Sequence, residues 1–146
     1  MSHMSRPASE HARIAAFLGT RGGRGAGALD YVEVLRRGLP ASAFKHASRE
    51  LDVPAGELSR SLGLNRRTLV RRKTRLSPTE SSRLFRLARL HARASEVLAG
   101  PAAATRWLRR PQRALAGAVP LELLDTDAGA LAVERLLGRI EDTVVT

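Results

Sequence analysis

The stretch LSRSLGLNRRTLVRRK, residues 58–73, holds six Lys or Arg side chains in sixteen positions and one glycine near its middle. Leu58 and Leu62 lie one helical turn apart, and Ser59 between them is small enough to let a second helix approach closely. Gly63 permits the left-handed turn that ends the first helix. This pattern predicts a helix-turn-helix.

The second helix of this motif is expected to start after Asn65, whose side chain can cap it. If Leu69 faces the core, rotations of about 100° per residue place Arg67, Thr68 and Arg71 on the opposite side, within reach of base edges. The remaining cations suit phosphates, although motifs of this type often have a buried apolar residue where Arg72 stands. The candidate DNA-binding residues are Asn65, Arg66, Arg67, Thr68, Arg71, Arg72 and Lys73.

The positive charge of the chain is concentrated around this motif. Residues 60–93 carry eleven cations and one acidic group, whereas residues 121–146 carry two cations and six acidic groups, within a total of +11. A charge run is often only a solvated face, but clustering on a glycine-hinged helix pair favours nucleic acid. Single-stranded RNA is the alternative, yet five aromatic residues in the whole chain offer few stacking platforms. Duplex DNA is therefore preferred.

The rest of the chain also shows helical spacing, and the fold class we predict is all-α. Ser77 and Glu80 form a capping box before a helix that runs to about Leu98, and a final helix is expected from 125–127 to about Asp142. The opening MSHM resembles a tag remnant, so residues 1–3 are set aside. We predict three parts: a flexible N-terminal arm (1–27), in which SEHARIAAFLG (9–19) is a candidate short helix, a helix-turn-helix domain (28–75) and a C-terminal domain (76–146).

Nothing in the chain assembles into a catalytic centre. Cysteine is absent, which excludes disulfides and thiolate chemistry, and the four histidines are scattered. His91 falls on the apolar side of its helix, where a hydrogen-bonded core histidine is the more common case. No segment has the length and hydropathy of a membrane span. We expect a soluble intracellular protein that is not an enzyme.

The last helix has a narrow apolar seam at Val133, Leu137, Ile140 and Val144. Two interpretations stay open for this seam: packing within the chain, or a surface for a partner or for self-association. Trp107 can likewise pack within the chain or contact a partner, although tryptophan is more often part of a core than of an interface.

Three segments together resemble a known family. They are RLSPTESSRLFRLAR (75–89), WLRRPQRAL (107–115) and PLELLDTDAGALAVERLLGRIE (120–141). With the helix-turn-helix they are similar to the Xre/MbcA/ParS antitoxins of bacterial toxin–antitoxin pairs, over about residues 38–142.

The resemblance implies an antitoxin that needs no cofactor. Its partners would be a toxin, commonly a RES-domain protein that consumes NAD or transfers ADP-ribose from it, and operator DNA, through which it represses its own operon as a homodimer within a larger complex. A bacterial cytoplasmic location follows, and the alternative is a stand-alone helix-turn-helix transcription regulator. The family's C-terminal segment covers the toxin's active site. We take as candidate toxin-binding residues Trp107, Leu137, Ile140, Val144, Val145 and Thr146.

Overall fold

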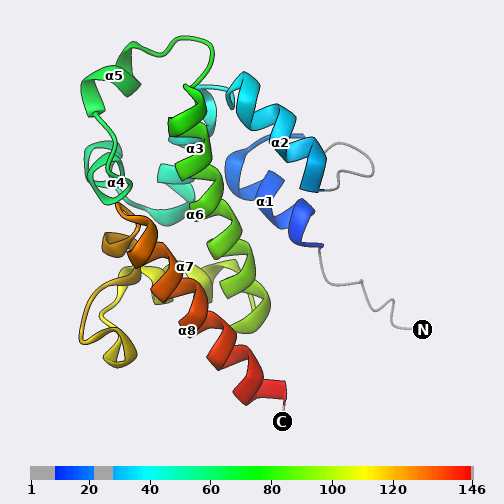
Figure 1. Cartoon of the computed structure of the whole chain (residues 1–146), viewed down its shortest axis with the longest axis vertical. Coiled ribbons are helices and arrows are strands. Elements are labelled where there is room, and N and C mark those ends of the chain that lie inside the picture. The colour runs from blue at the N-terminus through cyan, green and yellow to red at the C-terminus, as the bar shows by residue number, and fades with distance from the viewer. Residues whose placement is uncertain (1–8, 22–27, 146) are drawn as a thin grey trace.

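The computed structural model of the protein describes residues 9–21 and 28–145. At positions 28, 29, 144 and 145 it describes the backbone and not the side chains. Figure 1 shows helices arranged around one long central helix. In chain order the elements are α1 (Glu10–Leu18), α2 (Ala28–Arg37), α3 (Ser42–Leu51), α4 (Ala55–Ser61), α5 (Arg66–Arg71), α6 (Pro78–Val97), α7 (Pro101–Arg109), the 3-10 turns η1 (Arg113–Leu115) and η2 (Pro120–Leu123), and α8 (Asp127–Val145).

The central helix, α6, begins as the sequence predicts. The Ser77 hydroxyl accepts a hydrogen bond from the Glu80 amide, the Glu80 carboxylate accepts one from the Ser77 amide, and Pro78 occupies the first turn. These contacts satisfy amides that have no partner inside the helix. Helix α6 then contacts α1, α2, α7 and α8, so most of the core is built against it.

The all-α prediction is confirmed, since no strand occurs within residues 9–21 and 28–145 and only a single β-bridge joins Pro40 to Arg75. Phe44 and Leu51 of α3 and Leu58 and Leu62 of α4 are buried in the same core, as the spacing within each helix predicts. Among the described helices, none combines the length and hydropathy needed to cross a bilayer.

The flexible arm predicted for residues 1–27 is wrong for residues 9–21. Ser9 caps α1 through a hydrogen bond to the Ala12 amide, and Gly19 ends the helix at a φ of 65°. Ile14, Phe17 and Leu18 recur at helical spacing, and all three are buried against α6 and α3. The apolar face outweighed the nearby glycines, which begin only after the helix; residues 1–8 and 22–27 lie outside the described part.

Helix α2, which was not predicted from the sequence, covers another side of α6. Tyr31 stacks on the His11 ring with centroids 5.4 Å apart and lies 4.7 Å from the Phe85 ring centroid. The chain leaves α2 at Gly38, whose φ is 96° and where a Cβ atom would lie 2.1 Å from the Leu76 carbonyl oxygen. Only glycine fits this close approach.

His91 of α6 is a core residue, as predicted. Its side chain is 4% exposed, its Nε2 lies 3.0 Å from the Thr105 hydroxyl, and its ring centroid is 4.6 Å from that of Phe17. Burial lowers the pKa of His91 from 6.5 to about 4, with a smaller opposing contribution from a backbone hydrogen bond to Pro101. The folded protein therefore holds this imidazole neutral.

We predict that His91 makes the protein less stable in mild acid. Because the unfolded chain binds the proton more tightly, the stabilisation is complete above pH 6.5 and is lost as pH falls towards 4. Between pH 7.5 and pH 5 the free energy of unfolding falls by about 2 kcal/mol because of this residue. Urea unfolding at both pH values, with His91→Gln as comparison, measures it; an equal pH dependence in the two proteins would contradict the prediction.

Candidate nucleic-acid interface and partner-binding surface

Helices α4 and α5 form the predicted helix-turn-helix. Leu58 and Leu62 are fully buried, and Ser59, also buried, donates a hydrogen bond from its hydroxyl to the Gly56 carbonyl at 2.8 Å. Gly63 ends the first helix with a φ of 67°. The position of the turn is thus as the sequence predicts.

Arg83 of α6 fixes this turn from the side of the core. Its Nη1 donates hydrogen bonds to the carbonyls of Leu62 and Gly63, at 3.1 and 2.6 Å. A Cβ atom at Gly63 would lie 2.8 Å from Arg83 Nη1 and 3.3 Å from the Asp125 carbonyl oxygen. The sequence pattern pointed to glycine for its backbone freedom, and the structure adds a steric reason.

Helix α5 presents the expected side chains outward. Asn65 Oδ1 accepts a hydrogen bond from the Thr68 amide at 3.1 Å, so this side chain acts first as a helix cap. Leu69 is the buried residue of α5, while Arg67 and Arg71 on the opposite side are exposed and Thr68 is half-buried. The helix has six residues.

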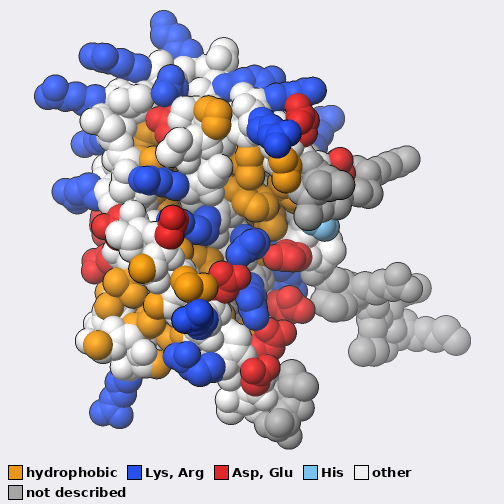
Figure 2. Space-filling view, in the orientation of Figure 1, with side chains coloured by type: hydrophobic (Ala, Val, Ile, Leu, Met, Phe, Trp, Pro, Cys, Tyr) orange, Lys and Arg blue, Asp and Glu red, His pale blue; other side chains and the backbone are white. Residues whose placement is uncertain are grey.

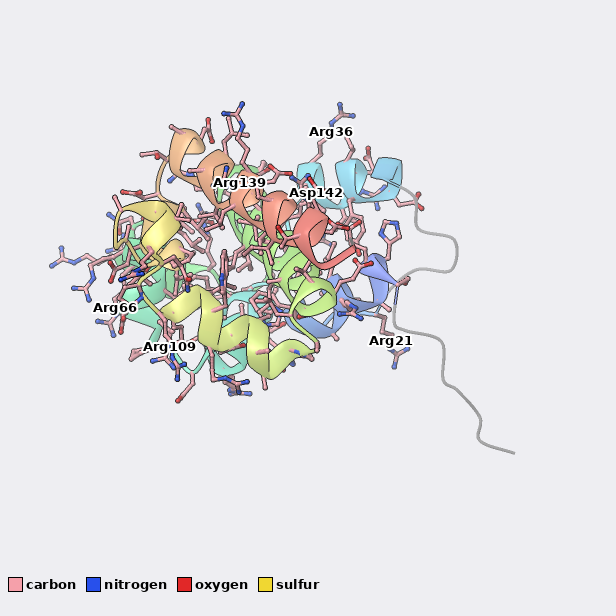
Figure 3. The ribbon with its side chains drawn as sticks, turned by 90° about the horizontal axis from the view of Figure 1, so that it is seen from below. Arg21, Arg36, Arg66, Arg109, Arg139 and Asp142 are labelled. Carbon is pink, nitrogen blue, oxygen red and sulfur yellow. The ribbon has the colours of Figure 1, made fainter. Side chains whose placement is uncertain are left out.

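Five exposed cations surround this motif, and we call them the α5 cation cluster: Arg60, Arg66, Arg67, Arg71 and Lys73. In the part of the chain that the structure describes, none of them lies within salt-bridge distance of a carboxylate. Figure 2 shows blue side chains projecting at the end of the molecule that holds α5, and Figure 3 shows Arg66 pointing away from the body. Such charges remain available to phosphates.

Arg72 has a different environment from the rest of the predicted DNA-binding set. Its Nε donates to Glu80 Oε1 at 3.1 Å, and the Glu80 side chain is buried. The same carboxylate oxygen accepts the Ser77 amide at 2.7 Å. Arg72 thus joins the end of α5 to the start of α6, which explains why a cation occupies an expected apolar position. Its contact with DNA stays a prediction.

A second group of cations in the basic stretch faces α8. Arg86 Nη1 lies 2.6 Å from Asp127, Arg89 Nη2 lies 2.8 Å from Glu134, and Arg93 Nη2 lies 3.2 Å from Glu141. Arg86 Nη2 also donates to the Leu124 carbonyl. These α6–α8 ion pairs show that the positive stretch 60–93 is not one nucleic-acid surface.

The first two residues of the apolar seam of α8 pack within the chain. Val133 and Leu137 are completely buried against α6, so Leu137 is corrected from a toxin contact to a core residue. Ile140 and Trp107 are half-buried, and Trp107 packs against the core. The side chains of Val144 and Val145, and Thr146, lie outside the described part. The free face of α8 carries Arg139 and Asp142 (Figure 3).

We predict that Glu80→Gln destabilises the fold by about 1.5–3 kcal/mol, since the amide keeps the bond from the Ser77 amide but loses the charge that Arg72 requires. Urea unfolding followed by circular dichroism measures the change.

The control for this variant is Glu96→Gln, an exposed residue near the end of the same helix. It removes one charge with little effect on stability. Equal stabilities of the two variants would mean that Glu80 does not hold α5 in place.

Two family models match the chain, one over its N-terminal part and one over its C-terminal part. The antitoxin Xre-like helix-turn-helix domain matches residues 30–89, and the antitoxin Xre/MbcA/ParS C-terminal toxin-binding domain matches residues 93–142. The two matches meet within α6, C-terminal to the division expected at 75/76. Helix α6 thus contributes to both parts.

Curated relatives agree with these matches. Proteins named antitoxin Xre from Photorhabdus laumondii and Yersinia enterocolitica are each 32% identical over 117 residues, which cover 77% of this chain and 79% of the relative. A Prs ADP-ribosylating antitoxin from Sphingobium is 29% identical over 125 residues with the same coverage. On these matches, which span both the helix-turn-helix and the C-terminal helices, the chain belongs to the Xre/MbcA/ParS antitoxins.

Proposed function

We propose that this chain neutralises a cognate RES-domain toxin through its C-terminal part and binds operator DNA through α5, so that it regulates its own operon. The observation that carries this proposal is the separation of the two surfaces. Helix α5 with its cation cluster lies at one end of the long axis, and the last turns of α8 lie at the other (Figure 1). One molecule can then hold both partners at once.

The DNA-binding part of this proposal rests on charge and shape. The α5 cation cluster faces outward without carboxylate partners among the described residues, and α5 is held at a fixed angle by Arg83 and by the Arg72–Glu80 pair. Arg67 and Arg71 occupy the outermost face, from which they contact base edges, while the other cations contact phosphates. Asn65 and Thr68 support α5 and lie near the same surface.

Homodimerisation belongs to the same proposal. A helix of six residues contacts only a few base pairs, so two copies on two half-sites are needed for a specific operator.

The toxin-binding part of the proposal rests on α8. The matched toxin-binding domain ends at residue 142, and α8 continues to Val145 beyond the end of α6 (Figure 1). We propose that Ile140, Val144, Val145 and Thr146 cover the toxin's active site, with Trp107 at the edge of the interface. The Sphingobium relative is named a Prs ADP-ribosylating antitoxin. This name agrees with a toxin that transfers ADP-ribose from NAD. Antitoxins of this family act by binding rather than by catalysis.

We predict that Arg67→Ala with Arg71→Ala lowers operator affinity at least ~100-fold, because each arginine bound to a base contributes on the order of 1–3 kcal/mol. Neutralisation of the toxin is expected to remain intact. Fluorescence anisotropy on operator duplex gives the affinity, and growth on co-expression with the neighbouring gene gives the neutralisation.

The matched control for this double variant is Arg36→Ala with Arg37→Ala, which removes the same charge from exposed positions on α2. For the wild type we expect log affinity to fall with log salt at a slope of about −3 per bound chain, since the three cluster cations assigned to phosphates, Arg60, Arg66 and Lys73, displace counterions. Equal losses from the two double variants would show that α5 is not the DNA-contacting element.

We predict that deletion of residues 140–146 abolishes protection against the toxin and leaves operator binding unchanged. The helix-turn-helix and the buried seam residues remain, whereas the segment that covers the active site is removed. Growth rescue and NAD levels in co-expressing cells measure the effect.

The control for the deletion is Glu141→Gln in the full chain, which breaks the ion pair with Arg93 without shortening α8. Full protection by the deleted chain would exclude this role of the C-terminal segment. It would leave a stand-alone transcription regulator as the better description.

A further inference from the structure

Val70 is the most exposed of the large apolar side chains in the described residues. Its exposed fraction is 74%, whereas Val32, Val34 and Leu131 lie at 41–44%. A single exposed valine is ordinary on a protein surface and by itself indicates nothing. What distinguishes Val70 is its place on α5.

The side chains beside Val70 on α5 are all cationic. Arg66 and Arg67 precede it by four and three residues, the spacing of neighbours on a helix surface, and Arg71 follows it. A rotation of about 100° from buried Leu69 places Val70 at the edge of the outward face. No carboxylate pairs with these arginines within the described ranges.

The surface that binds α5 must therefore be strongly anionic and still offer an apolar group close to the charges. The major groove of DNA meets both conditions, because phosphates line its edges and the C5 methyl of thymine is the apolar group among its base edges. The minor groove offers no such methyl group.

Valine also suits a contact of this kind. Its β-branched side chain is nearly fixed at χ1 in a helix, so little conformational entropy is lost when a small apolar group packs against it. The short side chain extends less far than the flanking arginines, which places the backbone of α5 near the bases when the contact is made.

We propose that Val70 contacts the C5 methyl of a thymine in each operator half-site and so selects that base at one position. This inference rests on the proposed DNA binding by α5 and adds a specificity determinant to it. Arg67 and Arg71 contact the neighbouring bases, and Val70 favours thymine over cytosine, whose C5 carries no methyl group and so loses this contact.

The test removes the thymine methyl group and the Val70 side chain, each alone and both together. A duplex is selected from a random pool by the wild-type protein, and each thymine of one half-site is then replaced by deoxyuridine, which lacks only the methyl. Anisotropy titrations compare wild type with Val70→Ala. We expect one replacement to weaken wild-type binding about four-fold, the effect of burying one methyl-sized group, and to leave Val70→Ala unaffected.

Val32→Ala is the matched control, the same change at an exposed valine of α2. It should keep the wild-type pattern across all replaced thymines. Because Val70 is exposed, Val70→Ala should also melt at the wild-type temperature, so that a loss of affinity is not a loss of folding.

The outcomes separate this inference from the proposed function. Sequence-specific binding in which wild type and Val70→Ala respond alike to every replacement overturns the thymine contact and leaves DNA binding by α5 in place. Unchanged DNA binding with weakened toxin binding or self-association in Val70→Ala assigns the residue to a protein contact and overturns the inference. Failure to select any duplex overturns both.

Discussion

The position of α5 depends on one buried carboxylate, that of Glu80. One of its oxygens accepts the Ser77 amide at the start of α6 and the Arg72 guanidinium at the end of α5. The short α5 buries little apolar surface of its own, with Leu69 as its buried side chain. Since a helix of this length is not stable alone, the link to α6 and the bonds from Arg83 to the intervening turn determine where α5 lies.

The cations of residues 60–93 fall into two groups with different roles. Cations of α5 and its flanks face solvent, whereas Arg86, Arg89 and Arg93 face the acidic side of α8 and hold that helix along α6. The exposed pairs among these contribute little stability individually, but together they set the register of α8 on its apolar seam. The charge asymmetry between the basic stretch and residues 121–146 is thus partly resolved within the molecule.

Local spacing was enough to predict much of the fold. The glycine turn, the Asn65 cap and the capping box of Ser77 and Glu80 each depend on residues within one or two helical turns, and all of them are present in the structure. Residues 9–19 were a candidate short helix, which α1 confirms, but the glycine-rich segment after it led to the prediction of a flexible arm, although Ile14, Phe17 and Leu18 already carried the periodic signal of a buried face. Helix α2 was missed because much of its apolar surface is only half-buried.

The sequence alone determined the helical class, the helix-turn-helix with its outward arginines, and the family to which the chain belongs, because these follow from spacing and residue type along the chain. It did not determine which charges remain free for a partner. Arg89 meets Glu134 and Arg93 meets Glu141 across separations of 45 and 48 residues, and Leu137 is buried by α6. Only the tertiary structure decided these contacts, because the energy of an ion pair and the burial of a side chain depend on distance in space rather than on order in the chain.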